Sequence, residues 1–314
     1  MSARTGAVLR SHGPGQQLKA EEVEQVAGPG ETLVEMRLAA VTQADRSVLA
    51  GKQPTQPFMP GSEGVGVAVT SASLAAGTPV LIRGEGVGVT RQGLWGRYAV
   101  VPDAAVHRLP AELDAVVALA LLTPALTAHT AVRRVAAVLD DETVVVTGVT
   151  SLLGRLCAAM ARAAGARKVI GLAWVGEAVD AAAPLVDQIV RVDELGQVGR
   201  ELPWCDAAID TVGGPVTSGV LGQITPGGRI AVLGYKAGEF TTIDLHQLIG
   251  RDLRVLPVNL QRTVLEPGAV SEALAAVAPV QVRPDVELVT ADRAGDALDR
   301  IAPDRRVFLD LTVF

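Results

Sequence analysis

The sequence TVVVTGVTSLLG, residues 143–154, decides the fold of the middle of the chain. Its first part is a short run of β-branched residues, which is typical of a strand buried on both faces. Gly148 permits a sharp turn after this strand, and Gly154 allows the following helix to lie close to the sheet. Backbone N–H groups and the positive end of a helix then converge on one spot. The stretch therefore predicts an anion-binding loop.

Strands and helices alternate after this loop. A helix is predicted over 153–164, and strands are predicted over 168–172, 188–190, 206–210 and 229–233. Such alternation implies right-handed crossovers and a parallel, doubly wound sheet. A glycine loop of this kind in that setting predicts a Rossmann dinucleotide-binding domain. The alternative, that the two glycines only form a turn, does not account for the repeated alternation.

The first third of the chain is predicted to be rich in β-structure. Short apolar strands at 32–38, 61–69, 79–82 and 98–101 are separated by Gly and Pro turns. This spacing favours a compact, barrel-like β domain. The remaining predicted elements are a helical region over 114–138, a helix over 268–278 and a closing strand over 307–312.

Length and composition limit the classes of function. The chain has 314 residues, enough for two domains, and its 49% hydrophobic content excludes extensive disorder. A formal net charge of −6 without a basic stripe argues against nucleic-acid binding. Cys157 and Cys205 are too far apart for a metal motif and are expected to be reduced thiols. The apolar stretch 115–132 contains Pro124 and His129, which favours a buried helix over a membrane span. We expect a cytoplasmic protein with no signal peptide and no membrane partner.

Six segments occur in one order along the chain and together resemble a known family. The segments are AAVTQAD (39–45), PGSEGVG (60–66), LTA (126–128), GVTSLLG (148–154), DTVGG (210–214) and PGGR (226–229). Together they are similar to the zinc-free quinone oxidoreductase and enoyl reductase branch of the medium-chain dehydrogenase/reductase superfamily. The resemblance implies an α/β fold in which a GroES-like β-rich catalytic domain, residues 1–118 and 257–314, contains an inserted Rossmann domain, residues 119–256.

The residue types at the family's zinc positions predict that there is no metal site. Zinc-dependent relatives place a cysteine near Thr42 and a histidine at the position of Ser62, and neither threonine nor serine is a usual zinc ligand. No cysteine precedes Cys157, so the four-cysteine lobe of such relatives is missing. The four histidines are isolated in sequence: His12, His107, His129 and His246.

The resemblance implies NADPH as the cofactor, with NADH not excluded. The residues expected to hold it are Thr127, Gly148, Thr150, Ser151, Leu152, Gly154, Val212, Gly234, Tyr235 and Arg306. Arg306 is assigned because relatives often place a lysine near this position, close to the cofactor.

Two departures from the family pattern concern this cofactor. Ser151 and Leu152 replace two adjacent glycines, and the Ser151 side chain either donates to a phosphate or pushes the ligand away. An acidic residue at the end of the second strand binds the ribose hydroxyls of NAD, whereas a basic residue or serine holds the 2′-phosphate of NADP. The segment LAWVGE, residues 172–177, has no basic residue before Arg191. We expect Glu177 to lie too late to bind ribose and to be a solvated residue at the start of a helix.

Tyr235 and Thr42 are the candidate catalytic residues. Tyr235 follows the strand at 229–233 and is the first candidate proton donor, although a wall or surface aromatic fits the same position. Thr42 stands where quinone reductases commonly have Asn. Together with residues 47–59 and 258–265, these side chains are expected to line a mostly apolar pocket. Such a pocket favours a small, uncharged and fairly hydrophobic substrate.

The sequence thus predicts an NADPH-dependent, zinc-independent oxidoreductase that reduces a quinone or an activated alkene by hydride transfer. The alternative is a cofactor-binding protein of the same descent whose chemistry is lost or redirected to a non-redox step, for example in a biosynthetic pathway. An alcohol- or sugar-oxidising dehydrogenase is a weaker third reading, because that chemistry in the family depends on zinc. The resemblance also implies a homodimer, since relatives often form dimers through the strand expected at 255–260. Pro257 in this stretch removes one hydrogen-bond donor and so weakens the pairing.

Overall fold

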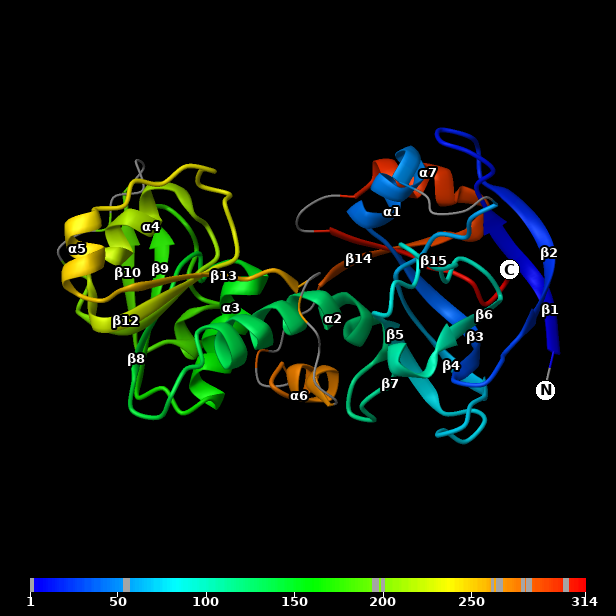
Figure 1. Cartoon of the computed structure of the whole chain (residues 1–314), viewed down its shortest axis with the longest axis horizontal. Helices are drawn as coiled ribbons and strands as arrows, with labels where there is room; N and C mark the ends of the chain where they lie inside the picture. Colours follow the sequence, from blue (N-terminus) through cyan, green and yellow to red (C-terminus); the bar gives the residue numbers. More distant parts are fainter. Residues whose placement is uncertain are drawn as a thin grey trace. The chain divides into compact units, whose positions relative to one another are not determined.

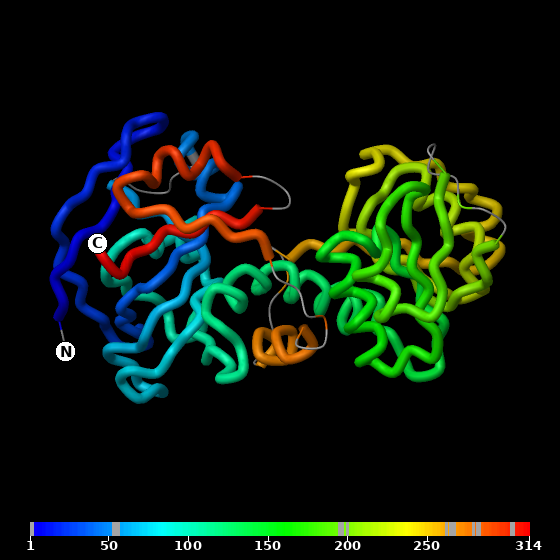
Figure 2. Tube along the Cα trace, turned by 180° about the vertical axis from the view of Figure 1, so that it is seen from behind, coloured from blue at the N-terminus to red at the C-terminus, as the bar shows by residue number. Residues whose placement is uncertain are grey.

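The chain folds as two units. The computed structural model describes residues 3–52, 57–193, 198, 201–260, 263, 268–277, 280, 284–301 and 305–314. One unit consists of Met1–Leu121 and Arg283–Phe314, and the other of Leu122–Val282. Figure 2 traces both ends of the chain into the first unit.

The expected domain boundaries are 118/119 and 256/257. They differ from this division mainly where the chain returns to the first unit, which happens at 282/283. The reason lies in the helix α6 (Ala269–Ala275), which groups with the end of the helix α2 (Ala115–His129). The carboxylate Oε2 of Glu272 in α6 lies 3.2 Å from Nε2 of His129. The segment that carries α6 therefore belongs to the dinucleotide-type unit rather than to the β-rich one.

The first unit is mainly β-structure. Its strands are β1 (Ala3–Arg10), β2 (Lys19–Val26), β3 (Glu31–Val41), β4 (Glu63–Thr70), β5 (Pro79–Arg83), β6 (Tyr98–Pro102), β7 (Val106–Arg108), β14 (Asp285–Thr290) and β15 (Arg305–Asp310). Its short helices are α1 (Gln43–Ser47), η1 (Val48–Lys52), η2 (Asp103–Ala105), η7 (Ala291–Arg293) and α7 (Ala294–Asp299). Among the described residues, β1 and β2 form a hairpin, and a seven-stranded sheet has the order β14-β15-β3-β4-β5-β7, with β6 also paired to β3.

Strand β3 is central to the first unit. It pairs with β15, β4 and β6, and most of its side chains are buried, among them Val34 and Met36. These two pack in one core cluster with the fully buried Trp95, whose Nε1 donates to the carbonyl oxygen of Ala40. The predicted β-rich character of this part of the chain is confirmed. The hairpin of β1 and β2 was not predicted, because half of the residues of β2 are charged and it lacks an apolar strand pattern.

The second unit is an α/β structure (Figure 1). Its strands are β8 (Thr143–Val146), β9 (Lys168–Trp174), β10 (Gln188–Val192), β11 (Cys205–Asp210), β12 (Ile224–Val232) and β13 (Arg254–Pro257). Its helices, besides the end of α2 and α6, are η3 (Thr130–Val135), α3 (Leu152–Ala163), η4 (Ala183–Leu185), α4 (Gly214–Leu221) and α5 (Leu245–Gly250). Within the described residues, the six strands are parallel and have the order β10-β9-β8-β11-β12-β13. This is the doubly wound order of a Rossmann domain, as the sequence predicted.

Helices cover both faces of this sheet. Val145, Ile170 and Ala208 point to one face and share a core cluster with Val216 and Val220 of α4. Helix α3 buries its own apolar side chains on the other side of the sheet from α4 and α5 (Figure 1). The connection from β9 to β10 is fully described and contains the short helix η4 but no α-helix, which departs from the predicted alternation.

The most apolar part of the chain is α2 together with η3. Ala115–Val135, which spans α2 and η3, is long and apolar enough to cross a membrane, with a mean hydropathy of 1.8. However, 67% of the most apolar part of this segment is buried inside the protein. Such burial is what a core helix of a folded domain shows, as the sequence predicted.

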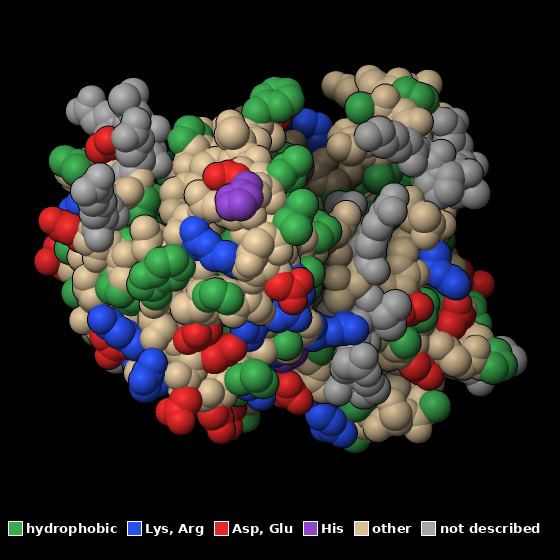
Figure 3. Space-filling view, turned by 60° about the vertical axis from the view of Figure 1, so that its left-hand side comes forward, with side chains coloured by type: hydrophobic (Ala, Val, Ile, Leu, Met, Phe, Trp, Pro, Cys, Tyr) green, Lys and Arg blue, Asp and Glu red, His purple; other side chains and the backbone are tan. Residues whose placement is uncertain are grey.

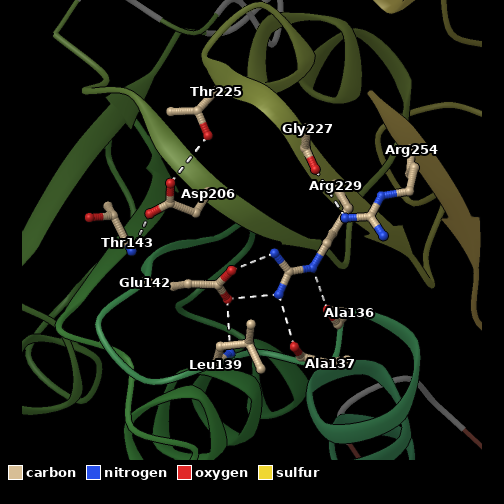
Figure 4. Close-up of polar contacts among 10 residues, drawn as sticks. All are labelled: Ala136, Ala137, Leu139, Glu142, Thr143, Asp206, Thr225, Gly227, Arg229 and Arg254. Atoms are coloured by element: carbon tan, nitrogen blue, oxygen red, sulfur yellow. Dashed lines mark hydrogen bonds and ion pairs between the residues drawn. The ribbon is translucent and has the colours of Figure 1, made fainter. Parts of the chain in front are cut away.

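A buried ion pair fastens the amino-terminal edge of the parallel sheet (Figure 4). The guanidinium of Arg229 in β12 donates to both carboxylate oxygens of Glu142, at 2.6 and 2.7 Å. It also donates to the carbonyl oxygens of Ala136 and Ala137, and Glu142 accepts the N–H of Leu139 at 2.9 Å. The arginine is 7% exposed. One bidentate pair thus holds the turn between η3 and β8 against the sheet.

Replacement of Arg229 by Ala is expected to lower the free energy of unfolding by about 3–5 kcal/mol, because Glu142 would be left buried without its partner. Urea unfolding followed by tryptophan fluorescence measures the loss. Arg254→Ala is the matched control, since among the described residues this exposed arginine in β13 donates only to the carbonyl oxygen of Gly227. Its loss is expected to stay below about 1 kcal/mol. Equal losses in the two variants would contradict the role given to the buried pair.

Candidate functional site

A tight loop joins β8 to α3 and forms the centre of the candidate site. Gly148 has a φ of 59°, and a Cβ there would lie 2.6 Å from Cγ1 of Val212. A Cβ on Gly154 would lie 2.2 Å from the carbonyl oxygen of Gly148. Both positions therefore exclude a side chain. The loop backbone is held close to the first turn of α3 and to Val212, two residues after the end of β11.

Ser151 is the N-cap of α3. Its hydroxyl accepts the N–H of Gly154 at 3.0 Å and donates to the carbonyl oxygen of Gly148 at 2.8 Å. The serine that stands in place of a glycine is thus accommodated, because its side chain bonds back to its own loop. In the described part of the chain, the N–H groups of Leu152 and Leu153 donate to no acceptor. They remain available at the positive end of a helix of 12 residues.

A buried carboxylate ties this loop to the end of β11. Asp210 is 0% exposed. Its Oδ1 accepts from the hydroxyl of Thr147 at 2.7 Å and from the N–H groups of Val212 and Gly213 at 3.1 and 3.0 Å. Its Oδ2 accepts from the hydroxyl of Thr217 at 2.5 Å. Four donors therefore satisfy a charge that is otherwise costly to bury.

Thr147 and Thr211 complete the connection between the two loops. The hydroxyl of Thr147 accepts the N–H of Thr211 at 2.8 Å, and the hydroxyl of Thr211 donates to the carbonyl oxygen of Thr147 at 2.7 Å. These residues follow the neighbouring strands β8 and β11, which lie where the strand order reverses. Ligands of open α/β sheets bind at this point. Sequence reasoning gave no role to Thr147 and used Asp210 only as the first residue of the segment 210–214, although a polar residue at the end of an apolar strand is a usable signal.

The loop after β12 packs against the loop after β11. A Cβ on Gly234 would lie 1.9 Å from the carbonyl oxygen of Thr211, so the two backbones are in close contact. The N–H of Ala237 donates to the carbonyl oxygen of Val212 at 2.7 Å. Tyr235 lies between these contacts, is 70% exposed, and its hydroxyl makes no hydrogen bond to any described residue. The structure thus brings Gly148, Val212 and Gly234 to one edge of the sheet.

A small apolar pocket opens beside the glycine loop. It lies at the carboxyl ends of β8, β9, β10 and β11 and includes the start of α4. Its lining residues are Gly148, Leu172, Ala173, Trp174, Val192, Val212 and Val216. The pocket has a volume of about 10 Å³, which is room for about one water molecule.

Glu177 lies elsewhere than the sequence suggested. It follows β9 in a turn and not at the start of a helix, and it is half-buried rather than solvated. Its Oε2 accepts the hydroxyl of Thr150 at 2.9 Å and the N–H of Trp174 at 3.0 Å. The expectation of a solvated helix-start residue was therefore wrong, because the chain folds back after β9 and directs this carboxylate toward the glycine loop.

The other residues singled out from the sequence belong to other elements. The hydroxyl of Thr127 in α2 donates to the carbonyl oxygen of Thr123, one turn earlier in the same helix. Thr42 and Arg306 belong to the first unit, where Thr42 is the N-cap of α1 and Arg306 lies in β15. The predicted pocket segments 47–59 and 258–265 fall partly outside the described residues.

Thr42 is held by a buried acid. Its hydroxyl donates to Oδ2 of Asp45 at 2.6 Å, and its N–H donates to the same oxygen at 2.8 Å. Oδ1 of Asp45 accepts the N–H of Gly61 at 2.9 Å. Burial raises the pKa of Asp45 from its ordinary value of 3.8 to about 6, although these hydrogen bonds oppose the shift and the nearby Glu63 adds to it. The orientation of the Thr42 hydroxyl is therefore fixed by Asp45.

Two further observations concern metals and surface charge. Within the described ranges, no three His, Cys, Asp or Glu side chains group closely enough to hold a metal ion. On the face drawn in Figure 3, basic and acidic side chains are interspersed. That face offers no single-signed surface of the kind that binds a polyanion.

Two family models match the chain. The model of the alcohol dehydrogenase GroES-like domain matches residues 28–111, and the model of the zinc-binding dehydrogenase family matches residues 153–278. Quinone oxidoreductases and an enoyl reductase are among the relatives of known name. The chain belongs to the medium-chain dehydrogenase/reductase superfamily, in its quinone and enoyl reductase branch. The predicted pairing of a GroES-like domain with a Rossmann domain is thereby confirmed.

Individual relatives of this superfamily member are distant. It is 27% identical over 248 residues to a zinc-type alcohol dehydrogenase-like protein of Schizosaccharomyces pombe, covering 76% of the chain and 74% of that protein. It is 34% identical over 142 residues to a probable NADPH-dependent quinone reductase of Emericella nidulans, covering 42% of the chain and 40% of that protein.

Solved structures share the fold. AibC has a TM-score of 0.77 at 23% identity, covering 98% of the chain and 95% of AibC. Bacillus subtilis YhfP with NAD bound has a TM-score of 0.71 at 20% identity, covering 98% of the chain and 100% of YhfP.

Asp210→Ala is expected to lower the free energy of unfolding by more than about 3 kcal/mol, because four buried donors would lose their acceptor. Asp210→Asn is expected to cost only about 1–2 kcal/mol, since its amide oxygen can keep the donors at Oδ1 and its amide group can donate to Thr217. Urea unfolding of both variants measures the difference. If both cost the same, the four-donor arrangement is not what stabilises this edge of the sheet.

Stability is expected to depend on pH through Asp45. Its pKa is higher in the folded than in the unfolded chain, so the folded state binds the proton more tightly. Folding therefore gains stability as the pH falls from about 6 toward about 4, by at most about 3 kcal/mol. Urea unfolding of the wild type and of Asp45→Asn between pH 4 and pH 7.5 tests this. The difference between the two proteins is expected to shift in favour of the wild type on acidification, whereas parallel curves would contradict it.

Proposed function

We propose that this oxidoreductase uses a nicotinamide dinucleotide to reduce a quinone or an activated alkene. The observation that carries the proposal is the glycine loop of residues 148–154, joined through Asp210 to the end of β11 at the point where the strand order reverses. This is the place where a doubly wound sheet binds a dinucleotide. The names of the relatives, which include quinone reductases and an enoyl reductase, support the substrate class.

The residues present fit a dinucleotide. The N–H groups of Leu152 and Leu153 would take the pyrophosphate at the start of α3. The hydroxyl of Ser151 bonds to Gly148 and Gly154 of its own loop. The serine therefore stabilises the loop conformation. A bound reduced nicotinamide supplies a hydride, which is the chemistry that the protein itself lacks.

The protein's own side chains would orient the substrate and supply a proton. We assign Tyr235 as the proton donor because its hydroxyl is exposed at the sheet edge that carries the glycine loop. Thr42, whose hydroxyl is fixed by Asp45, is assigned to position the substrate. Threonine and serine at positions 42 and 62 support a reaction without zinc. The substrate is expected to be small, uncharged and fairly hydrophobic.

The alternative, a cofactor-binding protein without redox activity, rests on the altered glycine loop, on the missing ligands for a 2′-phosphate and on the absence of a tyrosine before Tyr98. The N-cap role of Ser151 accounts for the replacement of the first of the two glycines, and both candidate functions keep a dinucleotide site at this loop. Fluorescence titration with NADH and NADPH, followed by turnover with a simple quinone and a simple enone, separates the two. The reductase is expected to bind at least one dinucleotide and to oxidise it with one of these acceptors. Binding without any turnover would favour the alternative, and failure to bind either dinucleotide would exclude both.

Tyr235→Phe tests the proton donor. Turnover is expected to fall at least about ten-fold while the dissociation constant of the dinucleotide stays unchanged, because a general acid contributes to the chemical step and not to binding. Phe240→Leu is the control, since Phe240 is an 89% exposed aromatic residue near the same loop. It is expected to leave turnover unchanged. Full activity of Tyr235→Phe would show that Tyr235 is not the proton donor and only lines the site or the surface.

A further inference from the structure

The turn after β9 contains an acidic side chain that the expected preference for NADPH does not explain. Glu177 is half-buried, and its Oε2 accepts both the hydroxyl of Thr150 and the N–H of Trp174. Thr150 belongs to the glycine loop, and Trp174 is the last residue of β9. The carboxylate thus lies between the two segments that meet the adenosine half of a dinucleotide in a doubly wound sheet.

The other carboxylate oxygen of Glu177 is available. Among the described residues, Oε1 accepts no hydrogen bond, although Oε2 has two donors. An ionised carboxylate accepts further hydrogen bonds at such an oxygen, and a vicinal diol offers two donors. The hydroxyl of Thr150 and the N–H of Trp174 fix the carboxylate before any ligand arrives, so little ordering remains to be done on binding.

Arg191 supports the same turn from β10. Its Nη1 donates to the carbonyl oxygens of Trp174 and Glu177, at 2.8 and 2.9 Å. These bonds hold the backbone of the turn, and through it the side chain of Glu177. The arginine is exposed, so it is also the residue that could neutralise a phosphate at this place. Its contacts favour the first role, because the guanidinium is already bound to the turn.

We infer that Glu177 makes this protein select NAD(H) over NADP(H), with Arg191 as a positioning residue. The carboxylate accepts the hydroxyls of the adenosine ribose and repels a 2′-phosphate that carries up to two negative charges. This inference rests on the proposed binding of a nicotinamide dinucleotide, and it reverses the preference that the family resemblance implied.

Binding to the purified full chain tests the inference without any assay of turnover. Intrinsic tryptophan fluorescence is titrated with NADH and with NADPH. The wild type is expected to bind NADH at least about ten-fold more tightly than NADPH. If neither dinucleotide binds, the proposed function itself fails. If both bind and NADPH binds as tightly or more tightly, only the selection by Glu177 is overturned.

Glu177→Gln removes the charge and keeps an amide oxygen that can accept from Thr150 and Trp174. It is expected to bring the two dissociation constants to within about three-fold of each other, mainly by tightening NADPH. Asp180→Asn is the matched control, because it removes the same charge from an exposed position three residues later that has no hydrogen bond to the loop. It is expected to keep the wild-type ratio. An unchanged ratio in Glu177→Gln overturns the inference.

Arg191→Ala separates the two roles open to this arginine. If Arg191 positions Glu177, its removal is expected to weaken NADH and to leave NADPH unchanged or tighter, because the carboxylate loses its fixed place. A residue that binds the 2′-phosphate would weaken NADPH alone. The second result would assign the end of β9 to NADPH recognition and would overturn the inference, whereas the first supports it.

Discussion

The carboxylate of Asp210 holds together the part of the molecule on which the site depends. It lies fully buried at the end of β11 and accepts hydrogen bonds from Thr147, Val212, Gly213 and Thr217. An ionised group in such a place is costly unless its lone pairs are satisfied, and here donors from three segments satisfy it. The loop after β8, the loop after β11 and the first turns of α4 therefore have fixed positions relative to one another. The close approach of Val212 to Gly148 follows from this arrangement.

The opposite edge of the same sheet depends on a different kind of contact. There Arg229 and Glu142 pair in a bidentate way and also bind backbone groups of the turn before β8 (Figure 4). The parallel strands are thus fastened at both ends by buried charged groups, while their middle is filled by apolar residues such as Val145 and Ile170. The site edge can therefore leave N–H groups unpaired at the start of α3, since its stability rests on Asp210.

Much of this architecture could be predicted from the sequence, because buried parallel strands and a glycine turn are local patterns. Residues 143–154 indicated β8, its loop and α3 nearly to the residue. Asp210 was noted only as part of the segment 210–214 and was given no role, since that role depends on donors up to 63 residues away in the chain. Glu177 was placed wrongly for a related reason. Its distance along the chain suggested a solvated helix start, but a turn that Arg191 holds brings it back to Thr150.

Two carboxylates at one edge of the sheet differ in a way that decides their roles. Both oxygens of Asp210 have protein donors, and no part of the residue reaches solvent, so it has nothing left to offer a ligand. Glu177 is only half-buried, and in the described structure one of its oxygens has no donor. A carboxylate that is oriented but incompletely satisfied gains by binding hydroxyl groups and loses when a phosphate approaches. The number of hydrogen bonds that each carboxylate oxygen already accepts therefore distinguishes the two acids. Asp210 stabilises the structure, whereas Glu177 can still bind a ligand and so select a cofactor.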